Sequence, residues 1–269
     1  MAFPDILEIL KESLILTAIV VGMMCIIELA DISSKGKLIQ AMKRSRFGSI
    51  AIAALLGAIP GCVGGYITVS MYSKRVIGFG ALLAMMIATT GDEAFLMLAM
   101  YPGKAAAIFS GLFILGIIAG LAADRLCKKQ GPDAPLQDTC AGEEHSHTGW
   151  KHLLLHALKV FLWAFSVMVV VALVEQRVDI ESWISNNTAL MILLATLIGC
   201  IPQSGPHMIF VTLFAGGVIP LPVLLASCIS QDGHAGLPLI ADRKKAFFQV
   251  KVIKCILALA VGFGAMLIQ

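Results

Sequence analysis

The chain has 269 residues, of which 58% are hydrophobic and only 14% are charged, and its formal net charge at pH 7 is +3. An ordinary soluble domain carries about 25% charged residues. The composition therefore excludes that class and predicts an all-α polytopic membrane protein. The small net charge gives no indication of nucleic-acid binding. The seven cysteines are odd in number and fall mostly in apolar segments, which excludes a disulfide framework.

The first half, residues 1–124, is predicted to contain three spanning helices and one re-entrant hairpin. The apolar pieces on either side of Pro60 are each shorter than the roughly 20 residues that a spanning helix needs. We therefore expect them to enter the membrane and return to the same side. In chain order, the predicted segments are the span 14–29, the hairpin 47–72, the broken span 76–101 with its break at 90–93, and the span 105–124.

The second half, residues 152–269, repeats this plan after a polar linker at residues 125–151. In chain order, its predicted segments are the span 152–175, the hairpin 188–217 around Pro202, the broken span 219–241 with its break at 232–235, and the final span 247–268. Counting each hairpin limb as a membrane segment gives about ten segments in the whole chain.

One sequence pattern occurs at matching places in the two halves. Each copy begins with G-x-I-P, continues through an apolar run and ends in a short break that contains ionisable residues: Gly91-Asp92-Glu93-Ala94 in the first copy and Asp232-Gly233-His234-Ala235 in the second. Pro60 lies 33 positions before Glu93, and Pro202 lies 32 positions before His234. Duplicated Gly/Pro-broken apolar segments of this kind are typical of the binding site of a secondary transporter.

Each half contains an odd number of spans, so the second half is expected to be inverted relative to the first. The distribution of Lys and Arg supports this topology, because it gathers nearly all of the basic clusters on one face, which is then cytoplasmic. Both termini are then outside. The alternative, with full-length spans at 47–72 and 188–217, places several basic clusters outside.

Ionisable residues at membrane depth cost about 2.5–3.5 kcal/mol each on insertion scales, so they need a functional reason. Their position beside helix breaks, together with neighbouring hydroxyl and amide groups, favours an oxygen-rich site for a divalent cation such as Mn²⁺. Cys62 and Cys200 lie near the hairpin tips, so a softer metal is not excluded as the bound ion. The candidate ligands are Asp92, Glu93, Asp232, His234, His207 and Gln203, supported by Thr90, Ser204, Ser230 and Gln231.

Each of these candidate ligands also has a purely structural interpretation. Asp92 and Glu93 fit a surface turn, and the two histidines fit hydrogen-bonded packing positions.

Two further sets of candidate residues have weaker support. Glu28 and Glu175 end matched helices and are candidates for gating or proton coupling, or simply interface residues. The linker residues Glu143, Glu144, His145 and His147 fit a cytoplasmic metal-capture segment or a plain solvated loop.

The motif pair resembles the manganese transporters, a family also described as ten-segment heavy-metal exporters or arsenic-efflux-like proteins. The resemblance rests on GDEAF after Gly57-x-I-P and on GCIPQSGPH and SQDGHAG in the second half, and it covers nearly the whole chain. It implies a bacterial inner-membrane exporter of a heavy-metal ion, with Mn²⁺ favoured and arsenite or another oxyanion as the competing substrate. The motif positions carried over are Asp92, Glu93, Gln203, His207, Asp232 and His234.

Three hypotheses follow. The first is a secondary exporter of a divalent metal, driven by proton or sodium antiport. The second is an arsenite or oxyanion permease that uses exposed N–H groups at helix ends. The third is a membrane-embedded enzyme or a structural subunit, although the chain has no Walker A motif and no clear nucleophile–base pair. We expect a non-enzyme whose partners are the lipid bilayer and its metal cargo, without a resident cofactor. A homodimer is compatible with the sequence.

Overall fold

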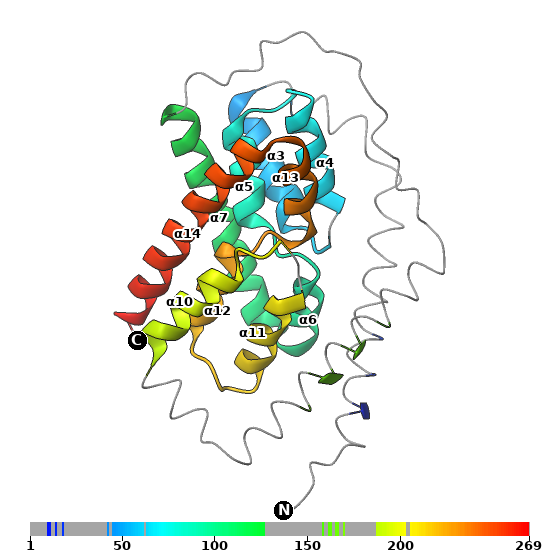
Figure 1. The fold of residues 1–269 in the computed structure, drawn as a ribbon, viewed down its shortest axis with the longest axis vertical. Helices are drawn as coiled ribbons and strands as arrows, with labels where there is room; N and C mark the ends of the chain where they lie inside the picture. The colour runs from blue at the N-terminus through cyan, green and yellow to red at the C-terminus, as the bar shows by residue number, and fades with distance from the viewer. Residues whose placement is uncertain are drawn as a thin grey trace, which may run out of the picture.

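The computed structural model describes residues 45–61, 63–126, 187–202 and 205–268, together with a few isolated positions outside these ranges. The four ranges fold into ten α-helices and one short 3-10 helix, labelled in Figure 1. The predicted spans 14–29 and 152–175 and nearly all of the linker 125–151 lie outside the four ranges.

The predicted hairpin around Pro60 consists of α3 (Arg46–Ala58) and α4 (Val63–Ser73), which pack against each other. Ser45 caps the start of α3, because its Oγ accepts a hydrogen bond from the Gly48 N–H at 2.9 Å. The helix stops before Ile59-Pro60, and Gly61 follows with a φ of 103°, a conformation that glycine adopts without steric cost. The break therefore lies at the predicted position.

The predicted broken span consists of α5 (Phe79–Ala88) and α6 (Glu93–Met100), whose axes bend by 40° at the break. The chain then turns into α7 (Pro102–Leu126), which packs closely on α5 through small residues. A Cβ added to Gly116 of α7 would lie 2.6 Å from the Ala84 carbonyl oxygen. Such close approach through small residues is typical of helix pairs in membranes.

The second half follows the same order. Its helices are α10 (Thr188–Ile198), α11 (Gly205–Ala215), α12 (Leu221–Ser230), the 3-10 helix η1 (Gly233–Ala235), α13 (Gly236–Asp242) and α14 (Lys244–Met266). The non-helical break starts at Gln231, one residue earlier than predicted. The last helix begins at Lys244, three residues before its predicted start, and its first two residues are lysines.

Corresponding helices of the two halves make corresponding contacts. In the first half α3 packs on α4, α5 and α7, and in the second half α10 packs on α11, α12 and α14. The halves also exchange elements, since α6 packs on α11 and α13 packs on α4. Figure 1 shows α3, α4 and α13 in the upper half of the bundle and α6, α10 and α11 in the lower half, while α7 and α14 run along its length in opposite directions.

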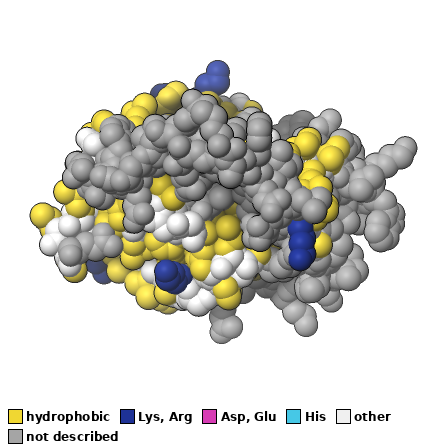
Figure 2. Space-filling view, turned by 90° about the horizontal axis from the view of Figure 1, so that it is seen from below, with side chains coloured by type: hydrophobic (Ala, Val, Ile, Leu, Met, Phe, Trp, Pro, Cys, Tyr) yellow, Lys and Arg dark blue, Asp and Glu magenta, His cyan; other side chains and the backbone are white. Residues whose placement is uncertain are grey.

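Within the described ranges, α7 and α14 are long and apolar enough to cross a membrane, and the bent pair α5–α6 counts as a third span by length and composition. Exposed apolar side chains mark the outer faces. Phe248, Val252 and Ile256 form a stripe along α14, each about 60% exposed. Hydrophobic side chains also dominate the described surface in Figure 2.

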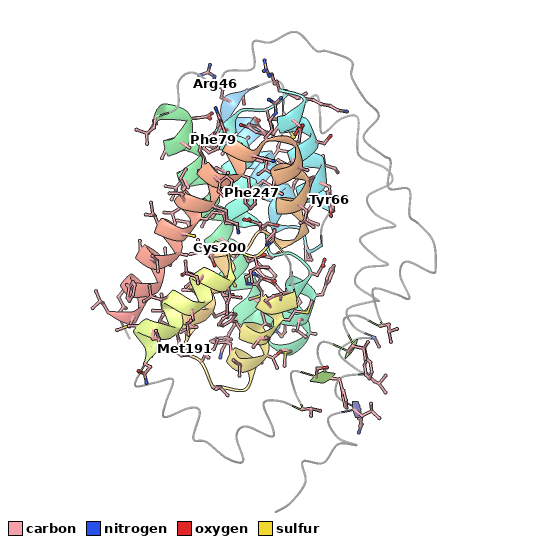
Figure 3. The ribbon with its side chains drawn as sticks, in the orientation of Figure 1. Arg46, Tyr66, Phe79, Met191, Cys200 and Phe247 are labelled. Atoms are coloured by element: carbon pink, nitrogen blue, oxygen red, sulfur yellow. The ribbon has the colours of Figure 1, made fainter. Side chains whose placement is uncertain are left out.

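Most basic side chains of the described ranges gather at one end of the bundle; the exceptions are Lys104 at the start of α7 and Lys251 and Lys254 within α14. The Arg243 guanidinium donates to the Ser73 carbonyl oxygen at 2.9 Å, which joins the start of α14 to the end of α4. Asp124 at the end of α7 accepts a hydrogen bond from the Gly80 N–H at 3.0 Å, which joins the end of α7 to the start of α5. Lys74, Arg75, Arg125, Lys244 and Lys245 adjoin these contacts in sequence, and Arg46 is at this end in Figure 3.

Candidate functional site

The two helix breaks meet across the halves. Gln231, which follows α12, donates from Nε2 to the carbonyl oxygen of Thr89, which follows α5, at 2.7 Å, although the residues are 142 positions apart. The Gln231 Oε1 accepts the Gly233 N–H at 2.8 Å. One buried amide side chain thus bonds to backbone groups that both broken helices leave without a helical partner.

Each hairpin tip lies against the break of its own half. The Gly61 N–H donates to the Gly91 carbonyl oxygen at 3.2 Å. A Cβ on Gly57 would lie 2.4 Å from the Met85 carbonyl oxygen, and a Cβ on Gly199 would lie 1.8 Å from Ser230 Oγ. These two glycines, which open the duplicated G-x-I-P pattern, are therefore needed for the hairpins to approach α5 and α12.

Two lysines of α14 reach the second break. Lys254 is fully buried, and its Nζ lies 2.7 Å from Asp232 Oδ1 and 2.5 Å from the Met86 carbonyl oxygen, and it also bonds the Gln231 carbonyl oxygen. Lys251 Nζ lies 2.5 Å from Asp232 Oδ2 and 2.6 Å from the Gly199 carbonyl oxygen. Asp232 is therefore held between two ammonium groups.

The lysines also complete the broken helices. Met86 is in the last turn of α5, and Lys251 bonds the carbonyl oxygen of Ser230, the last residue of α12, at 3.2 Å. Cations at helix C-termini are favourable because the carbonyl ends carry partial negative charge. The sequence contained a signal for both lysines: two charged residues lie three positions apart inside the apolar run 247–268, where each is costly.

Glu93 is the first residue of α6 and is 1% exposed. Within the described part of the chain its Oε2 has no hydrogen-bond partner, and neither has Oγ1 of the adjacent buried Thr90. Asp92 is also buried and takes part in an interaction of its own. Among the residues that the structure describes, nothing bonds this carboxylate oxygen or this hydroxyl, so the first break offers both as donors to a further group.

His207 of α11 is fully buried, and its Nδ1 lies 3.1 Å from Ser227 Oγ of α12. Its Nε2 has no partner among the described residues. Ser230 Oγ donates to the Ala226 carbonyl oxygen at 2.8 Å within α12, so its hydroxyl serves the helix itself. The structure thus keeps one imidazole nitrogen of this predicted site available.

Several predicted residues cannot be placed around this centre. The backbone of His234 lies in η1, and nothing is described of its side chain. Gln203, Ser204, Glu28, Glu175, Glu143, Glu144, His145 and His147 lie outside the described residues. Among those described, no group of three His, Cys, Asp or Glu side chains comes together to hold a metal ion. The predicted ligand set therefore stays a prediction.

A family model described as "Putative, 10TM heavy-metal exporter" matches residues 6–188 and 160–268 of the chain. The chain belongs to this family. The family is one of multi-pass membrane transporters rather than enzymes, and its ten segments agree with the predicted number. No curated protein and no solved structure matches the chain.

Proposed function

We propose that this member of the heavy-metal exporter family is a secondary transporter that works by alternating access around the two joined helix breaks. The hydrogen bond between Gln231 and Thr89 carries the proposal, because it brings the duplicated breaks to one place inside the bundle. Non-helical backbone at membrane depth is tolerated only where it is buried in protein or lines a cavity. Two such breaks in contact match the discontinuous helices around a transporter's substrate site.

We propose that the halves are inverted repeats, residues 1–124 and 152–269, joined by a cytoplasmic linker at 125–151. The matching helix contacts and the opposite directions of α7 and α14 support this relationship. The basic end of the bundle is then cytoplasmic and both chain termini are outside. The hairpins α3–α4 and α10–α11 enter from opposite sides.

In this mechanism one half rocks against the other, so the bonds that cross between the halves must break. Two of them are at the centre: Gln231 to Thr89, and Lys254 to the Met86 carbonyl oxygen. Contacts inside each half, such as the Gly61–Gly91 bond, are preserved. Proton or sodium antiport supplies the driving force, with Glu28 and Glu175 as candidate coupling groups and the Glu/His loop as a candidate capture segment.

Mn²⁺ is the proposed cargo. The unpartnered oxygens of Glu93 and Thr90, together with the Asp92 carboxylate and the His207 Nε2, offer the oxygen-rich and imidazole donors that suit this ion. Asp232, His234 and Gln203 complete the proposed set. Asp232 takes part once the ion shares or displaces the ammonium groups that now hold it.

An arsenite or oxyanion permease is the second candidate, and one observation favours it. Lys251 and Lys254 bring two positive charges to Asp232, which carries one negative charge. The three acidic residues of the breaks are therefore partly compensated by built-in cations, and the centre repels an anion less than the sequence suggested.

The experiment is uptake of Mn²⁺ into liposomes that contain the purified full-length protein, with Zn²⁺, Cd²⁺ and arsenite as competitors. Saturable Mn²⁺ uptake that other divalent cations reduce and arsenite does not is the expected result. Flux of arsenite alone would replace the cation proposal with the second candidate. Absence of flux for every species would contradict both and favour the non-transport hypothesis.

A further inference from the structure

Two cysteine sulfurs lie together at the tip of the second hairpin. Cys200 follows α10 and Cys255 lies within α14, and their Sγ atoms are 3.4 Å apart. Cys200 is exposed, whereas Cys255 is partly buried. Figure 3 shows Cys200 at about half the height of the bundle, between Phe79 near one end and Met191 near the other.

The surrounding contacts hold the two thiols in place. Cys200 Sγ lies 3.6 Å from the Thr196 carbonyl oxygen, to which its S–H donates, so the Cys255 thiol donates to the Cys200 sulfur. Lys251 bonds the carbonyl oxygen of Gly199, the residue before Cys200, and so ties the tip to α14. The packing of α10 on α14 therefore holds the two thiols close together in the folded protein.

We propose that Cys200 and Cys255 form a two-thiolate site for a soft divalent cation such as Cd²⁺. On binding, both S–H groups release their protons to water and two metal–sulfur bonds form. Thiolates are the ligands that soft metals prefer. The complex of one divalent cation with two thiolates is neutral, so it adds no net charge beside Lys251.

The sulfur separation fits this chemistry. Two thiolates on one tetrahedral Zn²⁺ ion, with Zn–S bonds of about 2.3 Å, lie roughly 3.8 Å apart. The observed separation of 3.4 Å therefore has to open by about 0.4 Å for an ion of this size and by more for the larger Cd²⁺. This is within reach of small side-chain rotations, because Cys200 is at the surface.

The site lies beside the centre and differs from it in chemistry. From Cys200 the chain of contacts runs through the Gly199 carbonyl oxygen and Lys251 to Asp232. An ion held by the thiols is thus connected through Gly199 and Lys251 to the second break. The oxygen donors at that break suit a harder ion. The inference goes beyond the proposed export of Mn²⁺ and does not depend on it.

The test uses purified, full-length, pre-reduced protein in detergent. Phenylarsine oxide condenses with two neighbouring thiols, forming two arsenic–sulfur bonds and releasing water, so the number of adducts in the intact mass counts thiol pairs. We expect Cys200→Ala and Cys255→Ala each to lose one adduct relative to the wild type. The control Cys228→Ala, which removes a buried thiol of α12, keeps the wild-type number.

Cd²⁺ is then added to the same proteins, and the ultraviolet sulfur-to-metal charge-transfer absorption is recorded. We expect the wild type and Cys228→Ala to show the same absorption, and both site variants to lose it. An unchanged adduct number in Cys200→Ala and Cys255→Ala, or an unchanged Cd²⁺ absorption, would overturn the proposal. Serine variants and size-exclusion profiles separate loss of the site from loss of folding. Because neither readout involves flux, the test is separate from that of Mn²⁺ transport.

Discussion

The ammonium nitrogen of Lys254 lies 2.7 Å from Oδ1 of Asp232, and neither side chain is accessible to solvent. Lys251 holds the other carboxylate oxygen of Asp232 at 2.5 Å. A buried pair of this kind is weak evidence for stability, but removal of one partner leaves an uncompensated charge. This network is therefore the most sensitive part of the centre.

We expect Lys254→Met to destabilise the protein markedly. Breaking a buried pair by removing one partner costs about 3–5 kcal/mol, and the remaining contact with Lys251 lowers that cost. The measurement is thermal unfolding of the purified protein in detergent. The matched control is Lys245→Met in the exposed first turn of α14, which we expect to change stability by less than about 0.5 kcal/mol.

A double-mutant cycle separates the ion pair from loss of packing. Asp232→Asn combined with Lys254→Met should cost less than the sum of the two single changes, with a coupling of about 0.5–3 kcal/mol. Additive costs would show that the two side chains do not act as a pair.

Gln231→Ala removes the bond that joins the two breaks. Loss of a buried hydrogen bond whose partners stay unsatisfied costs about 1–3 kcal/mol per group, and both the Thr89 carbonyl and the Gly233 N–H lose their partner. We expect lower thermal stability and reduced flux. Gln249→Ala on the exposed face of α14 is the control, and equal behaviour of the two variants would contradict the role of Gln231.

Two glycines of α7 test the close packing of the broken span. Gly116→Ala places a Cβ 2.6 Å from the Ala84 carbonyl oxygen, whereas Gly111→Ala meets nothing within 4 Å. Overpacking typically costs about 1–3 kcal/mol, and an unhindered Gly→Ala change in a helix gains about 0.4–1 kcal/mol. Melting temperatures should therefore move in opposite directions. A shift of the same sign in both would argue against the α5–α7 interface.

The proposed orientation predicts from which side of the membrane a reagent can reach each end of the bundle. A cysteine introduced at Arg75 should react with a membrane-impermeant maleimide only in inverted vesicles, and one at Lys104 only in intact cells. The unmodified protein supplies the background from its native cysteines. Labelling of both positions from the same side would contradict the proposed crossing of α5–α6 and the orientation of the first half.

The sequence predicted the hairpin tips because local chemistry determines them. Pro60 and Pro202 cannot continue a helix, and the apolar pieces around them are too short to span. The residue types at the first break, Asp92 and Glu93, also indicated a polar centre. These features depend only on residues that are neighbours along the chain, so they can be predicted from the sequence.

The lysines and the bond between the breaks depend on tertiary structure. Apart from Gln249, Lys251 and Lys254, the final span is apolar on all sides. The two lysines indicated a buried polar position, but nothing in the pattern determined that this face of α14 meets α12 or that Asp232 lies opposite it. The contact between Gln231 and Thr89 joins positions 142 apart. The exchange of α6 and α13 between the halves likewise follows from packing alone.

The central claim is that the joined breaks form the transport site, and flux through two variants tests it most directly. Glu93→Ala and Asp232→Ala, each reconstituted at the same density as the wild type and shown to be inserted and folded, should lose saturable Mn²⁺ uptake, whereas Lys245→Met keeps it. Wild-type uptake by both alanine variants would contradict the assignment of the site to the breaks.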